Sequence, residues 1–262
     1  MSVYKMTNAL VKTVSYFVYK SNKEDKMSIR YIFHGGTRDK NSDGSTRQKG
    51  IAHNSAFYLA AKNVANDYKS QGDTVTLIKI STATAMINEI NSNAESSIKS
   101  LDILCHGTPY SLNFSVKENE NCGLITGSIA KAMLKVYYSS WEDGIYDFSA
   151  RSQFVNDIDF SKFSSDARVQ IHGCNTAKGT MFGDTLTEAF SKELSSAGKS
   201  QAYVIGHMKK SNPLINGSKT TIQAQDYRHG KRAIIFDGDI IKETNQKGLI
   251  KHADIQSLIK AK

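Results

Sequence analysis

The sequence predicts an α/β protein with a mostly parallel sheet, helices on both faces of that sheet and a β-hairpin near the C-terminus. Short apolar runs rich in β-branched residues alternate with longer stretches of helical periodicity, which is typical of βαβ units. Four of these runs end at a His or Cys beside a Gly. No repeat or linker interrupts the alternation, so we expect one domain over residues 28–262, preceded by an N-terminal extension, residues 1–27.

The first half of the chain contains three of the predicted strands. Each is a short apolar run, and the runs cover residues 28–33, 74–80 and 99–105. Helical spacing of the apolar residues predicts helices over residues 54–65 and 83–93. Asn54 or Ser55 is placed to cap the first of these helices, and residues 127–136 show a third helical pattern.

The second half of the chain adds two strands, a helix and the hairpin. Residues 138–167 are rich in aromatic residues and Asp, which predicts a loop before the fourth strand, residues 168–171. The amphipathic pattern of residues 182–197 stops at Gly198, a residue type that commonly ends helices. The remaining elements are a fifth strand over residues 201–205 and a hairpin with strands 232–236 and 239–241 around the turn Asp237-Gly238.

Composition places the chain among folded proteins of a reducing environment. Its 262 residues are 39% hydrophobic, enough for a large core, and no run of about 18 apolar residues could span a membrane. Cys105, Cys122 and Cys174 form no C-x-x-C pair, so we expect free thiols rather than zinc ligands. Lysines interrupt the apolar stretch of residues 1–20, unlike a cleaved signal peptide. We expect a cytoplasmic protein, or one delivered into a target cell without a cleaved signal peptide.

The net charge of +9 admits a polyanionic partner. Basic residues are scattered, with local density only at Lys209-Lys210 and at residues 227–232. No familiar nucleic-acid module is present, so we expect no nucleic acid as partner. A small polyanion bound near the C-terminus stays a candidate.

Reactive side chains stand where four predicted strands end, at His34, His106, Cys174 and His207. In an open parallel sheet, ligands and chemistry gather at the carboxyl ends of the strands. A nucleophilic cysteine reacts as the thiolate and needs an imidazole close in space. His106 and Cys174 meet this need if the third and fourth strands are neighbours. The amide of Gly107, with amides at the start of the next helix, would then face the oxyanion of an acyl intermediate.

Two blocks of the sequence resemble a known family. His106-Gly107 follows the apolar run of residues 101–105, and Gly173-Cys174-Asn-Thr-Ala follows Val-Gln-Ile-His172. Their order and strand context resemble caspase-like cysteine peptidases, which include caspases, gingipains, legumains, separases and self-processing domains of bacterial toxins. The segments after Cys174 resemble the helix and next strand of the bacterial members. The likeness covers residues 28–207 and is densest at 99–108 and 168–206.

The resemblance implies a cysteine endopeptidase that acts on a protein or peptide substrate and needs no cofactor or metal. It implies His106 as the general acid and base, Cys174 as the nucleophile, and the amides of Gly107 and Cys174 as the oxyanion hole. A bacterial effector or toxin is one setting for such a chain. A small polyphosphate activator, known among the toxin relatives, is a further expectation.

The family also suggests where the substrate side chain binds. Its members build that pocket from the end of the first strand and from loops after the helix that follows the cysteine. Here this points to His34, Arg38 and residues 207–212, which begin with His207; an Arg would favour an acidic substrate residue. From strand parity, Asp102 lies on the face of His106 and is a candidate to orient it. His172, two residues before Cys174, is a second base, a substrate contact or a neighbour.

Four alternatives remain open at this point. The same fold and dyad could deamidate Gln or transfer an acyl group, because these reactions pass through similar thioester chemistry. A caspase-like scaffold could also serve only as an interaction module. A serine hydrolase is suggested by Ile32-Phe-His-Gly-Gly-Thr37 but opposed by the absence of a G-x-S-x-G motif. A metal site built from His34, His106, Cys174 and His207 lacks the usual ligand spacing.

Overall fold

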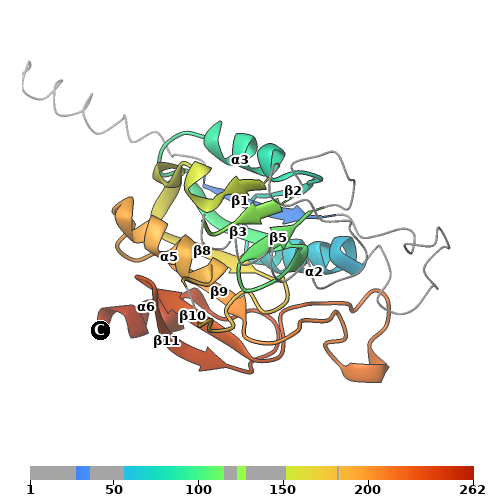
Figure 1. The fold of residues 1–262 in the computed structure, drawn as a ribbon. Helices are drawn as coiled ribbons and strands as arrows, with labels where there is room; N and C mark the ends of the chain where they lie inside the picture. The colour runs from blue at the N-terminus through green and yellow to red at the C-terminus, as the bar shows by residue number, and fades with distance from the viewer. Residues whose placement is uncertain (1–27, 36–55, 115–122, 128–151, 182) are drawn as a thin grey trace, which may run out of the picture.

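A parallel sheet forms the centre of the molecule in the computed structural model, which describes residues 28–35, 56–114, 123–127, 152–181 and 183–262 (Figure 1). Within these residues the main sheet has seven strands in the order β11-β10-β9-β8-β3-β1-β2. Their bounds are β1 Ile29–His34, β2 Val75–Lys79, β3 Ile98–Leu104, β8 Phe163–Ile171, β9 Tyr203–His207, β10 Arg232–Phe236 and β11 Asp239–Thr244. The pairs from β2 to β9 are parallel, and β10 and β11 are antiparallel to their neighbours.

A second, smaller sheet extends from the end of β3. It has the order β4-β5-β6-β7 within the described residues, and its strands are β4 His106–Gly107, β5 Ser111–Asn113, β6 Gly123–Ile125 and β7 Ser152–Phe154. Short 3₁₀ turns, Val155–Asp157 and Phe160–Lys162, lead from β7 to β8. Because β4 follows β3 after one residue, this sheet lies at the carboxyl edge of the main sheet.

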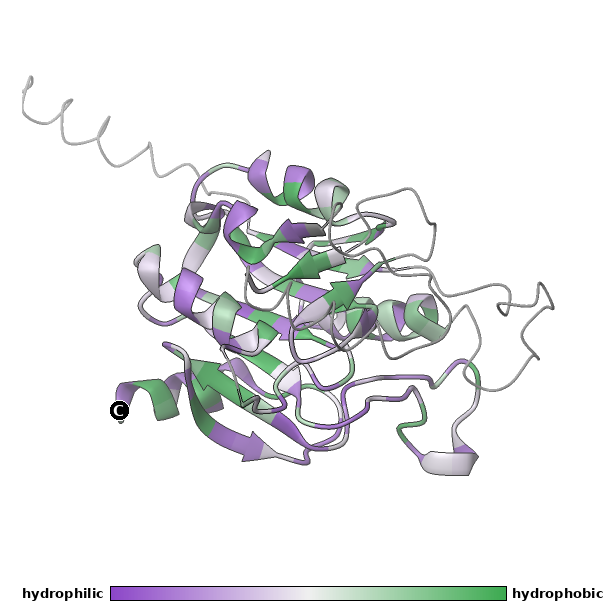
Figure 2. Ribbon diagram, in the orientation of Figure 1, coloured by the Kyte–Doolittle hydropathy of each residue, from purple (hydrophilic) through white to green (hydrophobic). Residues whose placement is uncertain are grey.

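Helices cover both faces of the main sheet. Residues of α3 (Ala83–Asn91) and α5 (Leu186–Ser196) pack with one face, and the buried side of α2 (Ala56–Ser70) packs with the other. The C-terminal helix α6 (His252–Lys260) packs on β9 and β10. Figure 2 shows hydrophobic residues on the central strands and alternating character on the helices. Helices on both faces explain why β3 is buried along almost its whole length.

Local sequence signals start and stop these elements. Thr82 caps α3 by accepting a hydrogen bond from the Ala85 amide at 3.1 Å. Thr185 and Glu188 form a reciprocal capping box at the start of α5. The β10–β11 turn holds Asp237 and Gly238 at φ values of 52° and 79°, so this turn needs the backbone freedom of Gly.

The predicted α/β class, the mostly parallel sheet and the C-terminal hairpin are confirmed. Some boundaries are wrong: β8 begins at Phe163 inside the predicted loop, and α5 begins at Leu186, four residues later than expected. Helix α6 and the second sheet were not predicted. The extension 1–27, the caps Asn54 and Ser55, Cys122, and all of the predicted helix 127–136 except its first residue lie outside the described residues.

Candidate active site

The sheet order brings the predicted reactive residues to one edge. Strands β3 and β8 are parallel neighbours with Ile103 opposite Ile171, so both leave the sheet at the same edge. Strand β1 lies beside β3 and strand β9 beside β8, each also parallel. The ends of all four strands therefore form one continuous edge, as the sequence predicted.

The segment that begins at His106 and the segment that carries Cys174 touch through their glycines. A Cβ atom added to Gly107 would lie 3.0 Å from the Cα of Gly173, and one added to Gly173 would lie 3.0 Å from the Cα of Gly107. No larger residue fits at either position without a shift of backbone. The residue after His106 and the residue before Cys174 are thus in direct backbone contact.

Hydrogen bonds fix the turn that carries Cys174. The amide of Asn175 donates to Lys209 O at 3.1 Å and the amide of Ala177 donates to His207 O at 2.9 Å. The Thr176 hydroxyl donates to Gly173 O at 3.2 Å. Asn175 itself has a φ of 59°, in the left-handed region that Asn tolerates better than most residues. The cysteine is therefore presented on a rigid, partly exposed turn.

Backbone amides are available beside this turn. The Thr108 amide donates to Ser111 O, so the adjacent Gly107–Leu112 pair is the non-bonded kind and the Gly107 N–H points away from β5. Within the part of the chain that the structure describes, the Cys174 amide has no hydrogen-bond acceptor. Both amides expected in an oxyanion hole are thus free of the local hydrogen-bond ladder.

The suggested contribution from the start of the following helix is wrong. The amides of Leu186, Thr187 and Glu188 already donate to Pro109 O, Thr176 O and Thr185 Oγ1. Helix α5 begins twelve residues after Cys174, at Leu186. Its first amides therefore connect the Cys174 turn with the turn between β4 and β5 instead of facing the thiol.

An aromatic pair, Phe57 of α2 and Tyr227 of the β9–β10 connection, lies beside His106. The exposed His106 lies edge-on to Phe57, with ring centroids 5.1 Å apart, and Phe57 stacks on Tyr227 at 5.2 Å. Burial raises the pKa of Tyr227 far above its ordinary value, and the nearby Cys174 raises it further. Sequence reasoning missed Phe57 and Tyr227, because only the folding of the long β9–β10 connection brings Tyr227 back over α2.

Asp102 is paired with His172 rather than with His106. Its Oδ1 atom lies 3.0 Å from His172 Nε2 and accepts a hydrogen bond from Gln170 at 3.0 Å. Its Oδ2 atom accepts a hydrogen bond of 2.6 Å from Tyr68. Although burial opposes it, the His172 bond together with the charges of His172 and Arg168 lowers the pKa of Asp102. The suggestion that Asp102 orients His106 is corrected accordingly.

The other predicted contact residues are mostly enclosed. His207 lies 6.3 Å from the ring of His172 and is almost fully buried, which lowers the pKa of His207 well below 6.5. His34 is also buried, and its ring lies 5.4 Å from Tyr58; burial lowers its pKa as well. Arg38 lies outside the described residues. The edge is therefore lined by several histidines, of which His106 is the exposed one among those described.

Among the described residues, no group of three or more His, Cys, Asp or Glu side chains could hold a metal ion. No helix in the described ranges is long and apolar enough to cross a lipid bilayer.

Two arginines of the basic stretch are buried, and cationic side chains also line a separate cavity. Arg228 bonds Asp226 and Asp67, and Arg232 donates to Gln246 O, so these two residues of the basic stretch are buried with internal partners. A cavity of about 420 Å³ lies instead near the amino ends of β1 and β3, lined by Arg30, Tyr68, Gln71, Lys99, Asp166, Arg168, Leu249, Lys251, His252 and Ala253.

Comparison of the sequence with protein-family models finds no match, and a search of curated proteins likewise finds no relative. Function therefore has to be inferred from the geometry of the site.

Proposed function

We propose that this protein is a caspase-like cysteine peptidase that cuts peptide bonds with a His106/Cys174 dyad. One observation carries the proposal: the backbones of Gly107 and Gly173 touch where the neighbouring parallel strands β3 and β8 end. That contact brings an exposed imidazole and a partly exposed thiol, 68 positions apart in the chain, to the same edge. The dyad needs a reduced thiol, so the proposal includes action in a reducing compartment, either the cell's own cytoplasm or that of a target cell.

The proposed reaction uses the groups at this edge in two steps. His106 accepts the thiol proton and the Cys174 sulfur attacks the scissile carbonyl carbon, while the Gly107 and Cys174 amides donate to the oxyanion. As the C–N bond breaks, His106 gives its proton to the leaving amine and a thioester remains. Water, deprotonated by His106, then attacks the thioester and releases the new carboxylate and the thiol.

The test compares wild type with Cys174→Ala on a proteome and reads newly formed N-termini. New termini that depend on Cys174 support the peptidase. Cleavage by both proteins, or by neither, overturns it. Cys105→Ala is the matched control. The Cys105 thiol is buried and burial raises its pKa, so this variant should cleave like wild type.

The same dyad on the same fold could deamidate or transfer an acyl group, and the test separates these outcomes. Mass spectrometry that finds intact proteins with a shifted mass, dependent on Cys174, would replace the peptidase with one of these reactions. An interaction module without catalysis predicts that Cys174 is alkylated no faster than Cys105. The partial exposure of Cys174 against the burial of Cys105 favours a reactive thiol.

We also infer that a small polyanion is a ligand of the cavity between α2 and the start of α6. Five side chains that carry or can carry positive charge line it, Arg30, Lys99, Arg168, Lys251 and His252, against the single carboxylate of Asp166. Arg168 is buried, and its Nε atom has no hydrogen-bond partner within the described chain. A buried cation with an open donor favours an anion with several oxygens.

Calorimetry with inositol hexakisphosphate tests this ligand. We expect binding by wild type and at least about tenfold weaker binding by the Lys99→Ala/Lys251→Ala double variant. The control is Lys209→Ala/Lys210→Ala, which removes two exposed lysines outside the cavity. No heat with wild type removes the polyanion, and loss of binding only in the control variant moves the ligand to the β9–β10 connection.

A further inference from the structure

Ser211 lies against the sulfur of Cys174. Both its carbonyl oxygen and its hydroxyl Oγ lie 3.5 Å from Cys174 Sγ, within hydrogen-bond distance for sulfur. The same hydroxyl donates to His172 O at 3.0 Å. The Ser211 hydroxyl therefore lies between the carbonyl oxygen of His172 and the thiol of Cys174.

The backbone around Ser211 is held on both sides. Two residues earlier, Lys209 O accepts a hydrogen bond from the amide of Asn175, next to the nucleophile. Two residues later, Pro213 O accepts one of 3.0 Å from the amide of Asp226. Ser211 thus sits in a fixed strip that runs beside the Cys174 turn.

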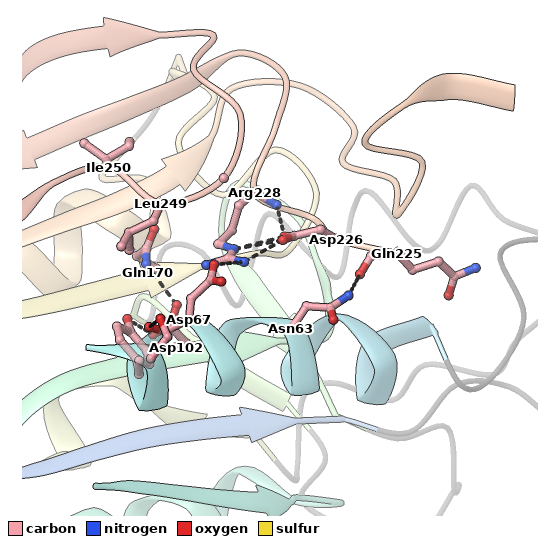
Figure 3. Close-up of polar contacts among 12 residues, drawn as sticks. Asn63, Asp67, Asp102, Gln170, Gln225, Asp226, Arg228, Leu249 and Ile250 are labelled. Atoms are coloured by element: carbon pink, nitrogen blue, oxygen red, sulfur yellow. Dashed lines mark hydrogen bonds and ion pairs between the residues drawn. The ribbon is translucent and has the colours of Figure 1, made fainter. Parts of the chain in front are cut away.

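A clamp on α2 secures the rest of this connection, residues 208–231. Asn63 donates to Gln223 O at 2.9 Å and to Gln225 O at 2.8 Å. Arg228 forms ion pairs of 2.7 Å with Asp67 and 2.6 Å with Asp226. Figure 3 shows Arg228 and Asp226 over α2, from which Asn63 and Asp67 project. Because the strip is clamped at its far end, Ser211 cannot drift easily from the sulfur.

We propose that Ser211 is a further residue of the site, whose hydroxyl stabilises the Cys174 thiolate by hydrogen bonding. When the thiol loses its proton to a base, the Ser211 carbonyl dipole faces a sulfur anion, which is unfavourable. A hydroxyl has one proton and two acceptor sites, so the Ser211 proton can turn from His172 O to the sulfur. Hydrogen bonds to an ionised group are about twice as strong as neutral ones, so this rotation favours the anion.

The role of this hydroxyl in catalysis rests on the proposed peptidase function, but its effect on the thiol can be measured without any substrate. The experiment follows iodoacetamide alkylation of Cys174 across pH by peptide mass spectrometry, in wild type and in the variants Ser211→Ala and Ser211→Thr. Ser218→Ala, an exposed serine of the same connection, is the matched control.

We expect alkylation of Ser211→Ala at pH 7 to be about tenfold slower, with the pH profile displaced to higher pH, and Ser211→Thr to behave like wild type. The limiting alkylation rate at high pH should stay unchanged. A purely structural role of Ser211 would instead alter access to the sulfur and would change that limiting rate. Identical profiles for wild type and Ser211→Ala, or a displaced profile for Ser211→Thr, overturn the role of Ser211. A displaced Ser211→Ala profile in a protein that cleaves nothing overturns the peptidase alone.

Discussion

Two histidines near Cys174, the proposed nucleophile, lie in opposite environments. His106 is exposed and packs edge-on against Phe57. His172 is only 2% exposed and is bonded to the fully buried Asp102, although both histidines precede a Gly at the end of a central strand. The comparison teaches that residue type and position mark both histidines as candidates and that their burial differs. We expect the exposed His106 to reach a substrate and the buried His172 to support the fold. The predictions below test that separation.

The largest expected effect is on activity. His106→Ala should lower the cleavage rate by about a thousandfold, because the proposed general acid and base is lost, and should change the free energy of unfolding by less than about 0.5 kcal/mol. His172→Ala, the matched variant, should lower the free energy of unfolding by about 2 to 3 kcal/mol, because the buried Asp102 loses the imidazole that is bonded to its Oδ1 atom. Cleavage rates and urea unfolding of both proteins measure the two effects.

The separation of roles fails if the two variants exchange behaviour. A His172→Ala protein that is folded and inactive, together with an active His106→Ala protein, would make the buried His172/Asp102 pair the base of the reaction. It would also mean that the exposed His106 takes no part in the reaction.

Removal of the buried carboxylate should give the largest loss of stability. Asp102→Ala leaves His172, Gln170 and Tyr68 without their common acceptor and leaves the charge of Arg168 unopposed. Breaking such a buried pair costs about 3 to 5 kcal/mol of the free energy of unfolding. Asp184→Ala, which removes an exposed ion pair with Lys192, is the control and should unfold like wild type. Urea midpoints that are equal for the two variants would contradict a supporting role for this cluster.

The sequence was informative wherever the signal was local and apolar. The runs that became β1, β2, β3 and β9 are short and β-branched, and the turn Asp237-Gly238 has the residues that its positive φ values require. Strand β8 was shortened in the prediction because its first residues, 163–167, include Ser164 and Asp166, which hydrogen bond to each other and carry little apolar signal.

The site was predictable in part, for a related physical reason. Strand ends carry their residues to one edge in any parallel sheet, so His106, Gly107 and Cys174 could be grouped from the sequence. The contacts of Ser211 and Tyr227 depend on how the 208–231 connection folds back over α2, held by Asn63 and Arg228. Such contacts join residues 37 to 170 positions apart and leave no periodic signal. Strand parity predicted the face of the sheet on which Asp102 lies. It did not predict which histidine on that face pairs with Asp102.

The smallest effect is a pH dependence of stability from His207. Burial, the charges of His172 and Arg232, and to a lesser extent that of His229, lower the pKa of His207 well below its ordinary value of 6.5. His207 therefore binds a proton near pH 6.5 in the unfolded chain but not in the folded protein. Its contribution to stability is fully present above this pH and is lost as the pH falls. The expected loss is about 1.4 kcal/mol for each pH unit below 6.5. Asp102, whose pKa is also lowered, contributes to such a loss only below about pH 4, because the unfolded carboxyl does not bind a proton at higher pH.

Urea unfolding at pH 7.5 and pH 5.5 separates the histidines from the carboxylates, since histidines change their protonation in the unfolded chain across this range and carboxylates do not. His34, whose pKa burial also lowers, adds to the difference in the wild type, so the variant at position 207 isolates the share of His207. His207→Gln should show a smaller difference in the free energy of unfolding between the two pH values than the wild type, while its value at pH 7.5 reports the cost of the substitution itself. A wild-type protein that is equally stable at both pH values would contradict this contribution of the buried His207.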